Sequence, residues 1–145
     1  MYFVDREKIE RTLIYLEENI ELYNTQEQFN TPLEKKALER IAVSIIEGIL
    51  DVGNAMIDGF IMRDPGSYED IIDILLDEKV VNKEQEEQLK QLIRMRKVLV
   101  QDYLEINHNE VEATVGENKE VVHTFTQSVR SYLVNELGPV TAFKN

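Results

Sequence analysis

The chain has 145 residues, of which 43% are hydrophobic and 30% are charged, and its formal net charge is −12. This length and apolar content predict a single domain, residues 1–145, with a core of its own, and they exclude an intrinsically disordered chain. The absence of cysteine excludes disulfide bonds, a thiol nucleophile and metal sites built from thiolates.

The first predicted helix follows a short charged segment at the N-terminus. Its apolar side chains recur every three or four residues, as the face of an amphipathic helix requires: Ile9, Leu13, Leu16, Ile20 and Tyr23. Residues 26–30 are polar and are predicted to form a turn.

A second, much longer helix is predicted to begin at Pro32. Thr31 is a favourable N-cap, proline suits the first helical position, and Glu34 stands where a capping box requires an acidic side chain. Apolar residues keep helical spacing as far as Arg63, and the sequence Asp-Pro-Gly at 64–66 is then predicted to end the helix.

Two further helices are predicted after this break. Ser67 is the expected cap of a short helix that reaches Leu76. Asn82 and Gln85 form another capping pair, and they predict a fourth helix that runs to about Ile106.

The C-terminal part is predicted to hold a polar loop and a last helix. Residues 107–118 form the loop, and the helix after it ends at the Gly-Pro sequence at 138–139. No segment alternates apolar and polar residues for long enough to predict a strand. The predicted fold class is therefore all-α, an up-and-down bundle of four main helices plus one short helix.

The chain is expected to be cytoplasmic. Its first residues, MYFVDREKIER, do not resemble a signal peptide, and its apolar runs are shorter than the roughly 20 residues of a membrane span, so no membrane contact is expected. The pI near 4.6 argues against broad nucleic-acid binding, because the field of the whole chain repels phosphate. No DNA binding is expected, and any contact with RNA must be local.

The long second helix carries a stripe of polar side chains at spacings of three or four: Arg40, Ser44, Glu47, Asp51, Asn54 and Asp58. Charged residues usually face water, so a solvated face is the simpler interpretation. The alternative is that Glu47, Asp51 or Asn54 faces a partner across the bundle or across a dimer interface. The glycines at 48, 53 and 59 favour close packing there, because glycine in a helix costs about 1 kcal/mol relative to alanine and usually has a structural reason.

One short segment is unusually basic for so acidic a chain. Four of the sixteen basic residues lie within eight positions: Lys90, Arg94, Arg96 and Lys97. On a continuous helix Arg96 and Tyr103 are about 20° apart and share a face, whereas Gln101 lies about 140° from Arg96. The simplest interpretation is that these cations pair with acidic residues of neighbouring helices.

Residues 96–103, RKVLVQDY, resemble a known motif. They are similar to the Arg-x4-His-x-Tyr signature of the HepT-like proteins, which belong to the HEPN group of helical ribonucleases. The segment 39–57, ERIAVSIIEGILDVGNAMI, resembles the second helix of that family, and length and helix order agree over essentially the whole chain. The resemblance implies a HEPN-like bundle, a homodimer whose two motifs line one cleft, and cleavage of RNA without a metal or other cofactor.

The resemblance also implies roles for individual residues. Positions 96 and 101 would be catalytic, since arginine binds phosphate through paired hydrogen bonds and histidine exchanges protons near neutral pH. Tyr103 would accept AMP from the family's partner, a minimal nucleotidyltransferase antitoxin of the MntA-like type. Supporting roles are expected for residues near the motif or on the polar stripe: Glu47, Asp51, Asn54, Arg94, Lys97 and His108.

The chain departs from the family signature at Gln101, which stands in place of the histidine. An amide can hold a phosphate or a water molecule, but it cannot exchange a proton in the working pH range. General acid–base transfer typically contributes roughly 10²- to 10⁴-fold to a rate. His108 could replace the missing base only if the helix bends, and otherwise it is a loop histidine.

Two functions therefore compete at the level of sequence. The first is a HepT-like toxin of a toxin–antitoxin pair, a metal-independent endoribonuclease weakened by Gln101. The second is a catalytically inactive HEPN dimer that binds RNA or a nucleotidyltransferase. Whether the chain is an enzyme depends on what Gln101 can do.

Overall fold

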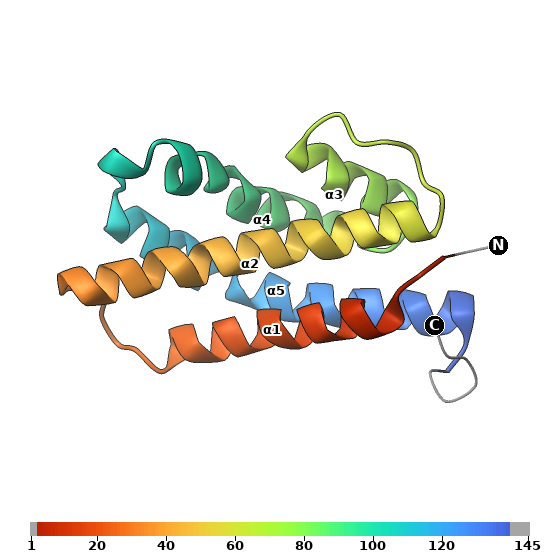
Figure 1. Cartoon of the computed structure of the whole chain (residues 1–145), viewed down its shortest axis with the longest axis horizontal. Helices are drawn as coiled ribbons and strands as arrows, with labels where there is room; N and C mark the ends of the chain where they lie inside the picture. The colour runs from red at the N-terminus through yellow and green to blue at the C-terminus, as the bar shows by residue number, and fades with distance from the viewer. Residues whose placement is uncertain (1–2, 140–145) are drawn as a thin grey trace.

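The computed structural model describes residues 3–139, and every regular element in that range is helical (Figure 1). In chain order the elements are α1 (Arg6–Asn24), α2 (Pro32–Gly59), α3 (Tyr68–Asp77), α4 (Lys83–Arg94), the short π-helix η1 (Lys97–Gln101), the 3-10 turn η2 (Tyr103–Glu105) and α5 (His108–Leu137). The predicted all-α bundle of four main helices and one short helix is confirmed. None of the helices in the described range is both long enough and apolar enough to cross a membrane.

Side-chain caps begin the helices where the sequence predicts them. Thr31 accepts a hydrogen bond from the Glu34 backbone N–H, and the Glu34 carboxylate accepts one from the Thr31 N–H, which completes a capping box. Asn82 and Gln85 form the same reciprocal pair at the start of α4, and Ser67 caps α3. Each such cap stabilises its helix by about 1 kcal/mol.

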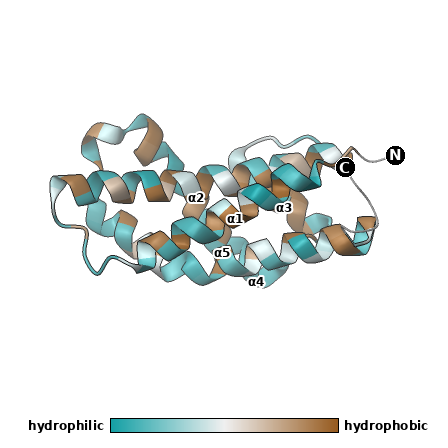
Figure 2. Ribbon diagram, turned by 60° about the horizontal axis from the view of Figure 1, so that its bottom comes forward, coloured by the Kyte–Doolittle hydropathy of each residue, from teal (hydrophilic) through white to brown (hydrophobic). Residues whose placement is uncertain are grey.

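The long helices α1, α2 and α5 lie side by side along the molecule, and α3 and α4 cover the remaining side of α2 and α5 (Figure 1). Apolar residues gather where the helices face one another, and hydrophilic residues cover most of the outer faces (Figure 2). The largest fully buried side chains include Leu13 of α1, Ile45 and Met56 of α2, Ile72 of α3 and Phe125 of α5. One core therefore joins all the long elements.

Glycines on α2 let neighbouring helices approach closely. A Cβ atom at Gly48 would lie 2.6 Å from Leu16 Cδ2 of α1, and one at Gly53 would overlap Ile71 Cγ2 of α3. The expected close packing at these glycines is thus present, and it is made with helices of the same chain. The glycines therefore allow close packing against α1 and α3, and not against a partner at the polar stripe.

Two helices end earlier than the sequence pattern predicts. The last residue of α2 is Gly59 and not Arg63, because Ile61 takes a positive φ of 56° and turns the chain away from the helix. The last residue of α4 is Arg94, and η1 and η2 replace the continuous helix that was predicted to reach Ile106. Apolar spacing persists beyond both true ends, so periodicity alone overestimates these helices.

The predicted polar loop at 107–118 is wrong, because α5 already begins at His108. Asn107 caps the helix by accepting a hydrogen bond from the Glu110 N–H. Val111 and Val115 are buried and give this polar segment an apolar stripe. At the other end, Gly138 has a φ of 82°, a value that favours glycine, and ends α5 where the sequence predicts.

Candidate functional site

The motif residues lie where α4 gives way to irregular helix. Arg96 precedes the π-helix η1, Gln101 ends it, and Tyr103 begins η2. The Asp102 N–H donates to the Lys97 carbonyl at 3.0 Å, which is the wider hydrogen bond of a π-turn. Such turns occur often at functional sites. The predicted common face of Arg96 and Tyr103 does not hold, because the α-helical period on which it rests ends at Arg94.

Arg96 reaches from this turn to two other helices. Its Nε atom donates to Glu47 Oε1 of α2 at 2.6 Å. Its guanidinium carbon lies 4.4 Å from the centroid of the Tyr68 ring, at the start of α3. The side chain is 22% exposed, and the hydrogen bond to Glu47 raises the pKa of Arg96 above its usual range. The structure thus holds a permanent cation in a defined position near the surface.

The neighbouring basic residues are occupied by acidic partners. Arg94 pairs with Glu69 of α3 and with Glu87 of its own helix. Lys97 binds Asp102 at 2.7 Å, within the motif segment itself. The interpretation that these cations pair with acidic neighbours is confirmed, although the partner of Lys97 is local. These pairs are largely exposed, so each adds little to stability.

Several side chains of η1 and η2 are exposed and form one surface, whereas Leu99 of η1 is buried in the core. Tyr103 is 60% exposed and Leu104 is 90% exposed, and Val100 is also exposed. The Gln101 side chain is exposed and makes no hydrogen bond to any residue in the range 3–139. We refer to Val100, Gln101, Tyr103 and Leu104 as the η surface. It is accessible in the single chain.

His108 is the first residue of α5 and is not a loop histidine. Its Nε2 atom lies 2.7 Å from Glu39 Oε2 of α2, and both side chains are mostly buried. Glu39 and Glu47 are eight residues apart on α2, roughly 12 Å along the helix axis. His108 and Arg96 therefore contact α2 at separate points, although the chain does bend between them. His123 lies in the middle of α5.

The polar stripe of α2 divides into three parts. Ser44 is buried and accepts a hydrogen bond from the Tyr15 hydroxyl at 3.0 Å. Glu47 faces Arg96 across the bundle, as one of the two interpretations predicts. Asp51 and Asn54 are exposed, and within the described residues neither contacts the motif. Only Glu47 of the predicted supporting residues on α2 is brought to Arg96.

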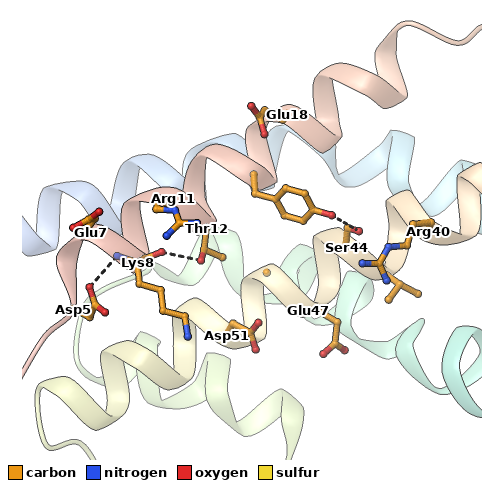
Figure 3. A pocket seen from close by; sticks show the side chains of 13 residues that line it. Asp5, Glu7, Lys8, Arg11, Thr12, Glu18, Arg40, Ser44, Glu47 and Asp51 are labelled. Atoms are coloured by element: carbon orange, nitrogen blue, oxygen red, sulfur yellow. Dashed lines mark hydrogen bonds between the residues drawn. The ribbon is translucent and has the colours of Figure 1, made fainter.

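A groove of about 730 Å³ separates α1 from α2 beside this stripe. Figure 3 shows Ser44 of α2 at the end of a dashed hydrogen bond that crosses the groove. Its donor is the Tyr15 hydroxyl of α1, and this hydrogen bond lowers the pKa of the Tyr15 phenol. Cations and carboxylates both line the groove: Lys8, Arg11 and Arg40 with Asp5, Glu7, Glu18, Glu47 and Asp51. Because Glu47 also binds Arg96, one end of the groove lies beside the motif.

Two Glu-x-x-His sequences, Glu105 to His108 and Glu120 to His123, have the spacing used in carboxylate-bridged metal bundles. Within residues 3–139, however, no group of three or more His, Asp or Glu side chains is arranged to hold a metal ion. The spacing alone therefore does not assemble a metal site.

Tyr68 is the neighbour of Arg96 that the sequence does not predict, since nothing in the spacing of Tyr68 connects it with Arg96.

Comparison with known proteins shows which family this chain resembles. The family described as "Ribonuclease HepT-like" matches residues 9–129. The protein named "Putative RNase YutE" from Bacillus subtilis (strain 168) is 51% identical over 144 residues, which are 99% of this chain and 100% of that protein. A solved structure, "Structure of Cytosolic Protein of Unknown Function YutE from Bacillus subtilis", has 50% identity and a TM-score of 0.94 over 99% of this chain and 100% of its own.

A more distant solved structure shares the fold. "Crystal structure of the toxin-antitoxin with AMP-PNP" has a TM-score of 0.74 at 16% identity, over 83% of this chain and 96% of that one. The family match covers most of the chain, and the sequence identity with the B. subtilis protein is 51%. This chain belongs to the HepT-like ribonuclease family.

Proposed function

We propose that this chain is the toxin component of a toxin–antitoxin pair and acts on RNA through Arg96. The observation that carries the proposal is the position of Arg96, a cation fixed at the start of a π-turn, with the later motif side chains, Gln101 and Tyr103, exposed. Family membership and the fold shared with a toxin–antitoxin structure support it.

The chemistry assigned to Arg96 is stabilisation of a phosphate at the moment of cleavage. Attack of the RNA 2′-hydroxyl on the adjacent phosphorus forms a phosphorane with added negative charge, and cleavage breaks the bond to the 5′-oxygen. A fixed guanidinium stabilises that charge without reorganisation. The 2′-hydroxyl must also lose a proton, and Gln101 cannot accept it. In this chain the proton of the 2′-hydroxyl passes to water, and water protonates the leaving 5′-oxygen. We therefore propose slow, metal-independent cleavage.

Restoring a titratable group at position 101 tests this function. Gln101→His should accelerate cleavage of single-stranded RNA by about 10²-fold or more, because the imidazole supplies general base catalysis. The rate is measured on purified protein with end-labelled RNA, in the presence of a chelator. The matched control is the double variant with Arg96→Ala, which should lose the gain.

A second candidate function follows from Gln101 itself. If the chain binds RNA but Gln101→His produces no cleavage, the chain is a non-catalytic RNA-binding dimer. If neither the native chain nor Gln101→His binds or cuts RNA, and neither arrests growth when expressed alone, the proposed toxin function is wrong.

The proposed partners are a second copy of the chain and a MntA-like nucleotidyltransferase antitoxin. The exposed Tyr103 phenol suits nucleotidyl transfer: its oxygen attacks the α-phosphorus of ATP, pyrophosphate leaves, and the phenol proton passes to the transferase or to water. An AMP group there would add charge and bulk beside the site. After co-expression with a transferase encoded beside it, the chain should gain the mass of one AMP, and Tyr103→Phe should not. An adduct that persists in Tyr103→Phe would exclude this residue as the acceptor.

A further inference from the structure

We propose that Glu47 and Tyr68 are positioning residues that present the two terminal nitrogens of Arg96 to an RNA phosphate. This inference rests on the proposed function, because it describes how the same site holds RNA. Neither residue is proposed to touch the substrate. Both act through the guanidinium: Glu47 contacts its edge at Nε, and the Tyr68 ring covers one face.

The hydrogen bonding of Arg96 differs from that of the other paired arginines. Its contact with Glu47 uses Nε, and neither Nη atom pairs with a carboxylate in the described part of the chain. Arg94 and Arg130 each engage Nε, Nη1 and Nη2 with carboxylates. Arg63 engages both of its Nη atoms with Asp70. Among these paired arginines, Arg96 is thus the one whose two Nη atoms, the terminal fork of the guanidinium, remain available.

An available fork is the part of arginine that binds phosphate best. The guanidinium is planar, and two adjacent N–H groups match two oxygens of a phosphate. Glu47 occupies the Nε position, so its carboxylate and a phosphate bound to the fork need not compete for the same hydrogens. The carboxylate also fixes the rotation of the group within its own plane.

Tyr68 fixes the remaining freedom of Arg96. Its ring lies 4.4 Å from the guanidinium carbon and covers one face of the group, an attractive arrangement of cation and aromatic ring. Tyr68 is the first residue of α3, and α3 is tied to the preceding loop by the paired hydrogen bonds between Arg63 and Asp70. The backbone that carries the half-exposed ring is therefore held in place. Arg96 is therefore held from α2 and from α3 at once.

The direction in which Glu47→Ala changes the RNA affinity distinguishes a positioning role from simple charge neutralisation. If Glu47 only neutralises Arg96, Glu47→Ala and Glu47→Gln should both strengthen RNA binding, because each removes a negative charge. If Glu47 positions Arg96, Glu47→Ala should weaken binding by up to about tenfold, the effect of one charge-assisted contact. Glu47→Gln should stay close to the native affinity, because the amide oxygen still accepts from Nε.

The experiment measures the affinity of the full chain for a short fluorescein-labelled single-stranded RNA, by anisotropy over a series of salt concentrations. Arg96→Ala should lower the salt slope by about 0.7, as expected for one lost phosphate contact. Tyr68→Leu should weaken RNA binding, whereas Tyr68→Phe should keep the native affinity because the aromatic ring remains. Asp58→Ala is the matched control, since it removes an exposed charge from α2 without touching Arg96, and it should not weaken binding.

The outcomes distinguish this inference from the proposed function. If native chain and Arg96→Ala bind RNA equally or not at all, the proposed function fails. If Arg96→Ala weakens binding but Glu47→Ala and Tyr68→Leu do not, the positioning role alone is overturned. Circular dichroism establishes that each variant is folded. Should Glu47→Ala fail to fold, the comparison of Tyr68→Leu with Tyr68→Phe decides the matter.

Discussion

Arg96 and Gln101 are five residues apart in one turn, yet their surroundings differ completely. Arg96 is held by Glu47 and Tyr68, whereas the Gln101 side chain faces solvent and makes no hydrogen bond to residues 3–139. A preorganised cation is useful for binding and for stabilising charge, but it does not move protons. At the level of residues, the candidate site therefore has a fixed cation at position 96 and a side chain at position 101 that does not titrate.

Asp70 gives a prediction for the dependence of stability on pH. It accepts two hydrogen bonds from Arg63 and one from the Gly66 N–H, which lower the pKa of its carboxyl from 3.8 to about 2. A pKa lowered in the folded state means that the ionised form stabilises the fold. This contribution is complete above about pH 4 and is lost as the pH falls through about 2.

Asp70→Asn should consequently lower Tm at neutral pH, and its difference from the native chain should shrink as the pH falls from 4 toward 2. Thermal unfolding followed by circular dichroism at a series of pH values measures both effects. Asp64→Asn, in the same loop but with no ion pair within the described residues, should leave the pH profile unchanged. A Tm difference for Asp70→Asn that is independent of pH would contradict the assigned role.

At the scale of elements, the sequence predicts the capped starts of α2, α3 and α4 well, but it misplaces the ends of α2 and α4 and the start of α5. The capping boxes at Thr31 and Asn82 are local chemistry and can be read from a few residues. The π-turn after Arg94 cannot, because Leu92, Met95 and Leu99 keep ordinary helical spacing into it. What the sequence could not supply is the contact of Arg96 with α2, which joins residues far apart in the chain.

The π-turn also explains which parts of the candidate site were predictable. The motif was identified from its resemblance to the family signature and Glu47 from the spacing of the polar stripe, and the structure brings Glu47 to Arg96. Tyr68 was not, since it meets Arg96 only through the packing of α3 against α4. The predicted loop at His108 failed for the same kind of reason, because burial of Val111 and Val115 against the core makes a polar segment helical.

At the scale of the whole molecule, the charge of −12 restricts how RNA could be held. Around the motif, Lys90, Arg94 and Lys97 are paired with carboxylates, so they add little positive field for a polyanion. Among the described basic residues of this segment, Arg96 is then the one whose terminal nitrogens are not hydrogen-bonded to a carboxylate. A two-fold dimer with facing motifs would offer two such arginines, and it would also cover the exposed leucine of the η surface.

We therefore predict a homodimer that depends on the η surface. Sedimentation equilibrium at micromolar concentration should give about twice the 16.9 kDa of one chain. Leu104→Asp should give the mass of one chain, because a charge at this 90% exposed position would be buried unpaired in the interface. Its helical content should not change, since Leu104 is outside the core of the single chain.

Leu22→Asp on α1 is the matched control, because it places the same charge on another exposed leucine and should leave the dimer intact. A native mass near that of one chain would overturn the dimer, and a dimeric Leu104→Asp would remove the η surface from the interface. If the dimer forms through this surface, Leu104→Asp should also lower RNA affinity although Leu104 is not a core residue, because the substitution separates the two Arg96 side chains that share the phosphate backbone.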